Sequence, residues 1–109
     1  MVSHPALHVV RYEDMISQPL KIFSAIASFL GMRVDKNRLR RAVRFSSFNT
    51  LAGQEKLNGF IERTPVQEKF FRSGKAGAWK KKLTEDQVKN IVAIHRQQMA
   101  RFDYLPKGY

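Results

Sequence analysis

Only one stretch of this chain has the composition of a β-strand, and that limits what the chain can fold into. Residues 7–12 (LHVVRY) are nearly continuous in apolar character, which is typical of a buried strand in a parallel sheet. A lone strand leaves its backbone N–H and C=O groups without partners. The sequence therefore predicts a mainly α chain whose single β-strand joins a parallel sheet completed by other residues or by a partner.

The next two segments carry helix signals. Ser17 predicts an N-cap and Pro19 suits the first turn of the helix that follows. Apolar residues then recur at steps of three and four, and Gly31 stands where a C′ glycine ends a helix. Asp35 predicts the N-cap of a second helix over residues 36–45, which is rich in cations.

A short helix and a long loop are expected after it. Ser46, Ser47 and Phe48 predict the start of a helix that runs towards Leu57. Residues 58–78 show no sustained period, and a loop of about 20 residues in a compact domain usually has a function.

The last helix has the strongest local signal. Thr84 and Gln87 have the spacing of a capping box, with two acids in the first turn. The expected buried stripe of this helix consists of Val88, Ile91, Val92, His95, Met99 and Phe102.

The composition restricts partners more than it identifies them. Twenty Lys and Arg against nine Asp and Glu give a net charge of +11, which attracts any polyanion, although a solvated basic surface explains the same charge. Cysteine is absent, so disulfides, thiolate zinc sites and a cysteine nucleophile are excluded, and no spacing predicts a metal site. No apolar run of about 18 residues predicts a membrane span, and no secretion signal opens the chain, so we expect a cytoplasmic location.

Three short segments have the chemistry to bind a nucleotide. Tyr12 stands at the end of the predicted strand, where a ring can stack on a base. Ser46 and Ser47 add hydroxyls to a helix N-terminus that attracts phosphate. The segment 72–74 (RSG) offers a guanidinium, a hydroxyl and a glycine that lets amides approach an anion. Each segment also has a structural explanation: a half-buried tyrosine, simple capping, and a basic surface loop.

The order of these segments resembles one family. The series YED, P, FLG, SF, R-x-G-x-x-G-x-W-K and LT, from about Val9 to Leu105, is similar to the C-terminal part of sulfotransferases that use 3′-phosphoadenosine 5′-phosphosulfate, and looks closer to bacterial members. The resemblance implies that residues 1–109 form a single partial domain of an α/β, P-loop-NTPase-like fold with a parallel sheet.

The resemblance also assigns binding roles to individual residues. It implies a partial site for the adenosine 3′-phosphate end of the sulfuryl donor, with no catalytic residue in this chain. In this assignment Tyr12 contacts the adenine, the adenine pocket is lined by Ser46, Ser47, Phe48 and Leu51, and the 3′-phosphate is held by Arg72, Ser73 and Gly74.

The chain departs from the family pattern at several positions. Ser73 stands where the family has a lysine, which removes one cation from the phosphate site, and Ala78 replaces the usual aspartate. The dimer motif of the animal enzymes is half present. Its first half fits at Lys80 and Thr84, whereas Glu85 and Lys89 occupy positions of a valine and a glutamate.

The family's phosphosulfate loop and catalytic base have no counterpart in this sequence. Sulfuryl transfer needs a base at the acceptor and positive charge on the bridging oxygen, so we expect this chain alone to be inactive. Expected partners are the nucleotide, and either an N-terminal partner chain or a second copy paired through the exposed strand. The alternative is a small basic helical module that binds nucleic acid or an acidic protein through the cationic helix 36–45.

Overall fold

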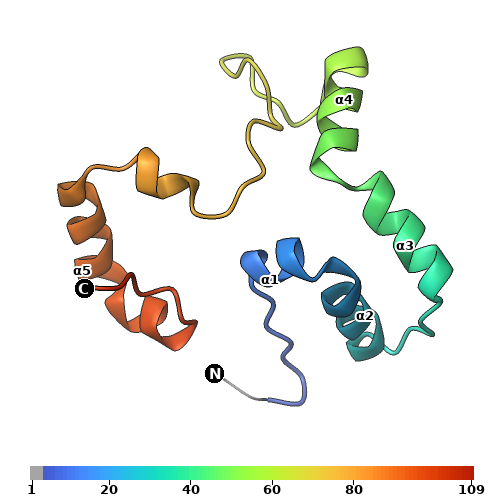
Figure 1. Ribbon diagram of the computed structural model, residues 1–109, viewed down its shortest axis with the longest axis horizontal. Helices are drawn as coiled ribbons and strands as arrows, with labels where there is room; N and C mark the ends of the chain where they lie inside the picture. The colour runs from blue at the N-terminus through green and yellow to red at the C-terminus, as the bar shows by residue number, and fades with distance from the viewer. Residues whose placement is uncertain (1–3) are drawn as a thin grey trace. The chain divides into compact units, whose positions relative to one another are not determined.

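The computed structural model describes residues 4–109 and divides them into two compact units (Figure 1). One unit is Val10–Ala76, and the other joins the described residues up to Val9 with Gly77–Tyr109. No helix in the described part of the chain is long and apolar enough to cross a bilayer. The helices are α1 (Tyr12–Ser17), α2 (Pro19–Phe29), α3 (Lys36–Phe45), α4 (Phe48–Asn58), the short 3-10 helix η1 (Ala78–Lys81) and α5 (Glu85–Arg101).

The mainly α prediction is confirmed, but the predicted strand is wrong for the described residues. Near its start, His4 and Leu7 form only an isolated bridge, in which the Leu7 N–H donates to the His4 carbonyl at 3.0 Å. Tyr12 is already the first residue of α1. An extended segment becomes a strand only when a neighbour pairs with its backbone, and the described part of the chain supplies no such neighbour. The strand edge expected to mediate self-association is therefore also missing from these residues.

The N-cap of α2 falls one residue later than the sequence predicts, and the sequence does not predict α1 before it. Gln18, not Ser17, is the N-cap of α2, while the Ser17 hydroxyl donates to the Asp14 carbonyl at 3.4 Å. Pro19 occupies the first turn of α2 as predicted. A proline disfavours helical backbone at the residue before it, so the interruption lies at Gln18 and Ser17 remains in α1.

Gly31 ends α2 as predicted. Its φ of +73° is in the left-handed region, which glycine adopts without steric cost. The Gly31 N–H donates to Ser28 at 3.0 Å, and the Met32 N–H donates to Ala27 at 2.9 Å. This pair of bonds is a Schellman motif, which satisfies carbonyls at the end of the helix.

Asp35 caps α3, and the helix has the bounds predicted from the sequence. Its Oδ1 accepts hydrogen bonds from Asn37 N at 2.9 Å and Arg38 N at 3.1 Å. The Arg38 amide is the main cause that lowers the pKa of Asp35, and the Asn37 amide acts in the same direction. The cap therefore stabilises α3 above the ordinary carboxyl pKa and loses this effect as the pH falls through the lowered value.

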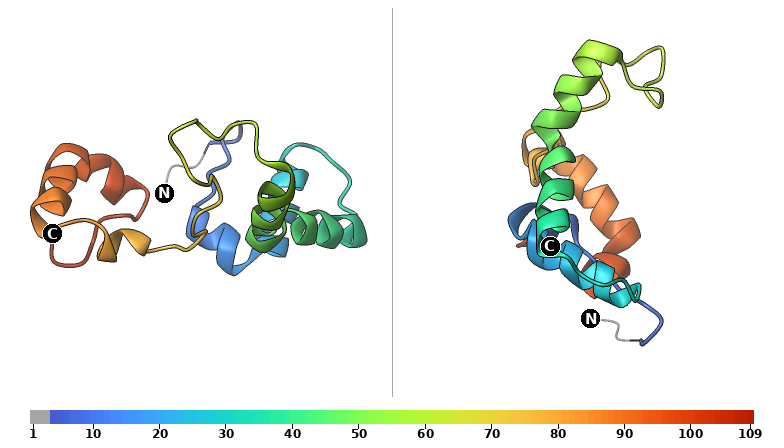
Figure 2. Two further views of the ribbon diagram at one scale, coloured as in Figure 1. Left: turned by 90° about the horizontal axis from the view of Figure 1, so that it is seen from above. Right: turned by 90° about the vertical axis from the view of Figure 1, so that its right-hand side faces the viewer.

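Within Val10–Ala76 the helices contact one another in chain order, α1 with α2, α2 with α3, and α3 with α4. Figures 1 and 2 show α4 continuing from α3 after a bend. Residues 59–76 then return beside α4 and contain no helix, so the loop predicted over 58–78 is confirmed except at its two ends, where Asn58 belongs to α4 and Ala78 to η1.

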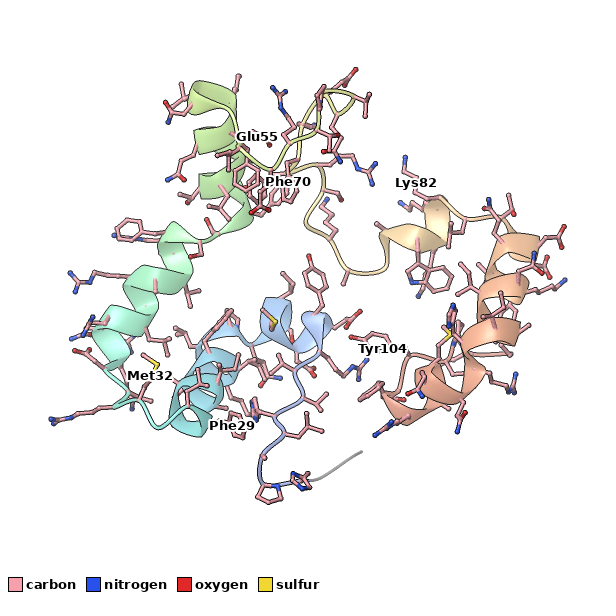
Figure 3. All side chains as sticks on the ribbon, turned by 180° about the vertical axis from the view of Figure 1, so that it is seen from behind. Phe29, Met32, Glu55, Phe70, Lys82 and Tyr104 are labelled. Carbon is pink, nitrogen blue, oxygen red and sulfur yellow. The ribbon has the colours of Figure 1, made fainter. Side chains whose placement is uncertain are left out.

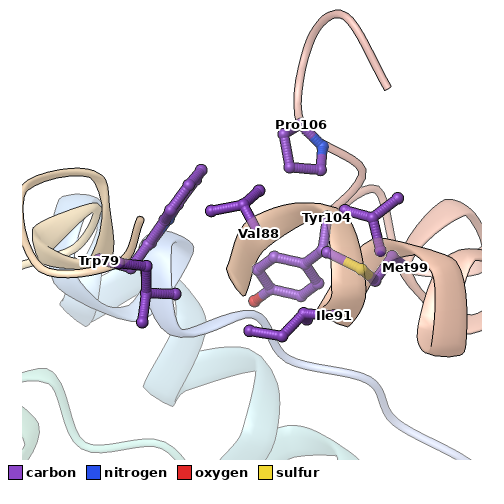
Figure 4. A pocket seen from close by; sticks show the side chains of 8 residues that line it. Trp79, Val88, Ile91, Met99, Tyr104 and Pro106 are labelled. Atoms are coloured by element: carbon purple, nitrogen blue, oxygen red, sulfur yellow. The ribbon is translucent and has the colours of Figure 1, made fainter. Parts of the chain in front are cut away.

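The other unit is built around α5. Val88 and Val92 are buried as predicted, whereas Ile91 and His95 of the expected stripe are exposed. The segment after α5 folds back so that apolar side chains enclose a surface cavity of about 270 Å³ (Figure 4). The cavity is lined by Trp79, Leu83, Val88, Ile91, Val92, Met99, Tyr104 and Pro106.

Thr84 is expected to control the stability of this unit. Its hydroxyl accepts from Gln87 N at 3.3 Å while the Gln87 side chain accepts from Thr84 N at 2.9 Å, so the predicted capping box is confirmed. Thr84→Ala should lower the free energy of unfolding by about 1 kcal/mol, because the backbone N–H of Gln87 loses the Thr84 hydroxyl as its acceptor. Denaturation followed by fluorescence of Trp79, which lies in the same unit, measures this loss.

The matched control for this experiment is Thr84→Ser, which keeps the capping hydroxyl. It should unfold close to the unaltered chain. Equal destabilisation by both substitutions would show that the methyl group of Thr84, and not its hydroxyl, stabilises the unit.

Candidate functional site

The start of α4 is held by a network of hydroxyl groups. Ser47 is the N-cap, and its Oγ accepts from Thr50 N at 3.3 Å and lies 2.8 Å from Thr50 Oγ1. Thr50 Oγ1 donates to the Arg44 carbonyl at 3.2 Å, which ties α4 to the end of α3. Ser46 is the C-cap of α3, and its N–H donates to Ala42 at 3.0 Å. Both serines thus have structural roles, and their predicted nucleotide contacts stay predictions.

A single buried carboxylate attaches the long loop to α4. Glu55 is 8% exposed, and it lies beside Phe70 in Figure 3. Its Oε1 accepts from Phe70 N at 2.6 Å, and its Oε2 accepts from Phe71 N at 2.9 Å. The Phe70 amide is the main cause that lowers the pKa of Glu55, against the effect of burial; the Phe71 amide and the nearby charges of Arg63 and Lys69 also lower it.

Aromatic rings surround these hydrogen bonds. The ring centroid of Phe60 lies 4.7 Å from that of Phe70 and 4.9 Å from that of Phe71. The ring centroids of Phe70 and Phe71 are 5.2 Å apart. Phe71 also meets Phe48 of α4 edge to face at 6.5 Å. An edge-to-face pair stabilises by about 0.5–1.5 kcal/mol beyond area burial. Through the pair of Phe71 and Phe48, the loop is packed on α4 as well as hydrogen-bonded to it.

Gly74 lies directly against the ring of Phe48. A Cβ atom at Gly74 would stand 2.7 Å from Phe48 Cγ, closer than such atoms approach. Its φ of +60° is also in the left-handed region. Only glycine meets both conditions without strain. Two of the three predicted site segments, the start of α4 and residues 72–74, are therefore brought together.

A cavity of about 580 Å³ opens where these segments meet. It combines aromatic faces with cations, which suits a ligand that has both a planar ring and an anionic group. Its lining residues are Phe48, Ala52, Glu55, Lys56, Gly59, Arg63, Glu68, Lys69, Phe71 and Arg72.

The remaining predicted residues lie in the same unit. Tyr12 is 44% exposed at the start of α1, so it does not stand at the end of a strand. Leu51 is half-buried in the first turn of α4, where its N–H donates to the Ser47 carbonyl at 3.0 Å. Ser73 is exposed between Arg72 and Gly74. The nucleotide roles predicted for these residues stay predictions.

Sequence reasoning missed Glu55. The signal that could have found it is charge, because Glu55 is the first acid after Asp35 in a strongly basic stretch. Its partners are backbone amides, which every residue except proline carries and which therefore leave no pattern in a sequence.

Residues 2–103 match the sulfotransferase domain family. The chain belongs to the sulfotransferase family. Sulfotransferase 1B1 of Mus musculus is 30% identical over 89% of this chain and 33% of its own length. The 3-beta-hydroxysteroid sulfotransferase of Cavia porcellus is 29% identical over 91% of this chain and 35% of its own length. Cytosolic sulfotransferase 17 of Arabidopsis thaliana is 27% identical over 88% of this chain and 31% of its own length.

This sulfotransferase-family chain spans about a third of the length of these curated relatives. No solved structure matches it. The matches confirm the resemblance drawn from the motif order and favour it over a small basic module that binds nucleic acid. The similarity to bacterial members and the C-terminal position stay predictions.

Because Gly74 contacts the Phe48 ring, we expect a methyl group added at position 74 to lower the free energy of unfolding by an unusually large amount. Gly74→Ala should lose about 1–2 kcal/mol from the left-handed backbone and roughly 1–3 kcal/mol more from the overlap with the ring. Chemical denaturation measures the loss, and the ring signals of Phe48 in NMR spectra should shift.

Gly31→Ala is the matched control, because Gly31 has φ +73° in the same unit and no atom within 4 Å of a Cβ. It should show the backbone cost alone and leave the Phe48 ring signals in place. Equal losses with unshifted Phe48 signals in both variants would contradict the contact.

Proposed function

We propose that the unit Val10–Ala76 carries the adenosine 3′-phosphate part of a sulfuryl-donor site. Sulfotransferases take their sulfuryl group from 3′-phosphoadenosine 5′-phosphosulfate, and family membership supports this donor for the present chain. The observation that carries the proposal is the contact of Gly74 with Phe48, because it joins the segment expected to hold the phosphate to the segment expected to line the adenine pocket.

The residues at this junction fit the proposed ligand. The side chain of Arg72 is exposed and offers a guanidinium fork that matches phosphate oxygens. Glycine at position 74 lets backbone amides come close to an anion. The Phe48 ring supplies an apolar face against which an adenine can pack.

The loss of the family's lysine at Ser73 does not remove the positive field. Lys56, Arg63 and Lys69 line the same cavity as Arg72. A phosphate carries up to two negative charges near neutral pH, so several cations around one cavity can replace a single missing lysine. In this proposal the four cations that line the cavity attract the phosphate together.

We place only the nucleotide contacts in this chain. The bound donor would supply an activated sulfuryl group, which full-length members of the family transfer to a hydroxyl or amine acceptor. The base and the phosphosulfate loop that the resemblance implies have no counterpart in the sequence, so we expect binding without transfer from this chain alone.

Preference for the 3′-phosphate tests the proposal. Titration calorimetry should give tighter binding of adenosine 3′,5′-bisphosphate than of AMP, at low and at moderate salt. Arg72→Ala should weaken the bisphosphate by roughly tenfold or more, because a hydrogen bond to a charged group is lost, and should change AMP little.

Arg33→Ala removes the same charge from an exposed position of the same unit and is the matched control. It should preserve the preference for the bisphosphate. Equal weak binding of both nucleotides, with a steep loss of affinity in salt, would contradict the proposal and indicate general attraction of polyanions.

A further inference from the structure

We infer that Glu55 is a positioning residue for the proposed 3′-phosphate site, because its carboxylate fixes the backbone that presents Arg72, Ser73 and Gly74. The inference rests on the proposed function of these three residues. Glu55 itself would not touch the ligand. It acts through the amides of Phe70 and Phe71, which immediately precede Arg72.

The geometry of the two hydrogen bonds sets the course of the chain. Successive amides of an extended segment point to opposite sides, but those of Phe70 and Phe71 converge on the two oxygens of one carboxylate. This convergence requires a bend at that point, and the backbone bends at Phe70. The direction in which residues 72–74 leave the bend is thereby fixed relative to α4.

The aromatic contacts carry this arrangement to the site. Phe71 is held by Glu55 through its amide and meets Phe48 through its ring. Three residues later Gly74 rests on the same Phe48 ring. Arg72 and Ser73 thus lie on a short span whose two ends are attached to α4, which reduces the conformational freedom lost on binding.

If Glu55 acted only through its negative charge, neutralising it would change ligand binding in the opposite direction. A negative group on the wall of a cavity that binds phosphate repels the ligand, so simple electrostatics predicts that neutralising Glu55 tightens binding. Positioning predicts that neutralising it weakens binding, because the amide of glutamine offers one oxygen where two are needed. The sign of the change therefore separates the two explanations.

Glu55→Gln is the decisive variant, and Glu68→Gln is its control. Glu68 lines the same cavity, but its side chain is exposed, so the control removes equal charge without disturbing the bend. Titration with adenosine 3′,5′-bisphosphate and AMP should show a roughly tenfold loss for the bisphosphate in Glu55→Gln, and little change for AMP. Glu68→Gln should bind the bisphosphate slightly more tightly, because it removes a negative charge from the same cavity.

Two outcomes of the titration separate the proposals. A preference for the bisphosphate that Glu55→Gln keeps or strengthens would overturn the positioning role and leave the proposed function standing. The absence of any preference in the unaltered chain would overturn the proposed function and, with it, the role of Glu55.

The unaltered chain gives a second test that does not depend on a variant folding. Because the pKa of Glu55 is lowered, its bonds to the loop persist above the ordinary carboxyl pKa and are lost as the pH falls through the lowered value. The amide protons of Phe70 and Phe71 should shift together in that single step in NMR spectra. The other charged groups around Glu55 are Lys56 from α4 and Arg63, Glu68, Lys69 and Arg72 from the loop.

The control for this titration is again Glu68→Gln, in which the same joint step should remain. Amides that move at separate pH values, or whose joint step disappears in Glu68→Gln, would overturn the inference. Their joint movement supports it.

Discussion

The hydrogen bonds from Phe70 and Phe71 to the Glu55 carboxylate join parts of the chain that are 15 and 16 positions apart. A buried carboxylate without partners is costly, so these bonds and the nearby cations are a condition for its burial. The rings of Phe60, Phe70 and Phe71 pack together next to these bonds, and the bonds attach the returning loop to α4. Phe48 of α4 and Arg72 of the loop line one cavity at this attachment.

The rest of the unit Val10–Ala76 is organised by shorter-range interactions. Each helix contacts the next one along the chain, and local hydrogen bonds close the junctions from α2 to α4. Gly31 ends α2, Asp35 begins α3, and Ser47 with Thr50 begins α4. These junctions position α4 relative to α3, and the long-range contacts of Glu55 and Phe48 then attach the loop that carries Arg72.

Family membership and the geometry of the site support each other. Residues 2–103 match a sulfotransferase domain, and the motifs that resemble this family include both SSF and RSG. These motifs are separated by more than 20 residues, yet Phe48 and Gly74 are in contact. This contact is the observation on which the proposed function rests.

The sequence by itself determined α2, α3, α4 and α5, because their signals are local, whereas it did not predict α1 or η1. Asp35, Gly31 and the pair Thr84 and Gln87 act within a few residues, so their spacing predicts the helix ends correctly. The strand over residues 7–12 was predicted wrongly, since a strand depends on a neighbour that composition cannot reveal. Glu55 and the closeness of Gly74 to Phe48 were decided only by the tertiary structure, because their partners are backbone amides and a distant ring.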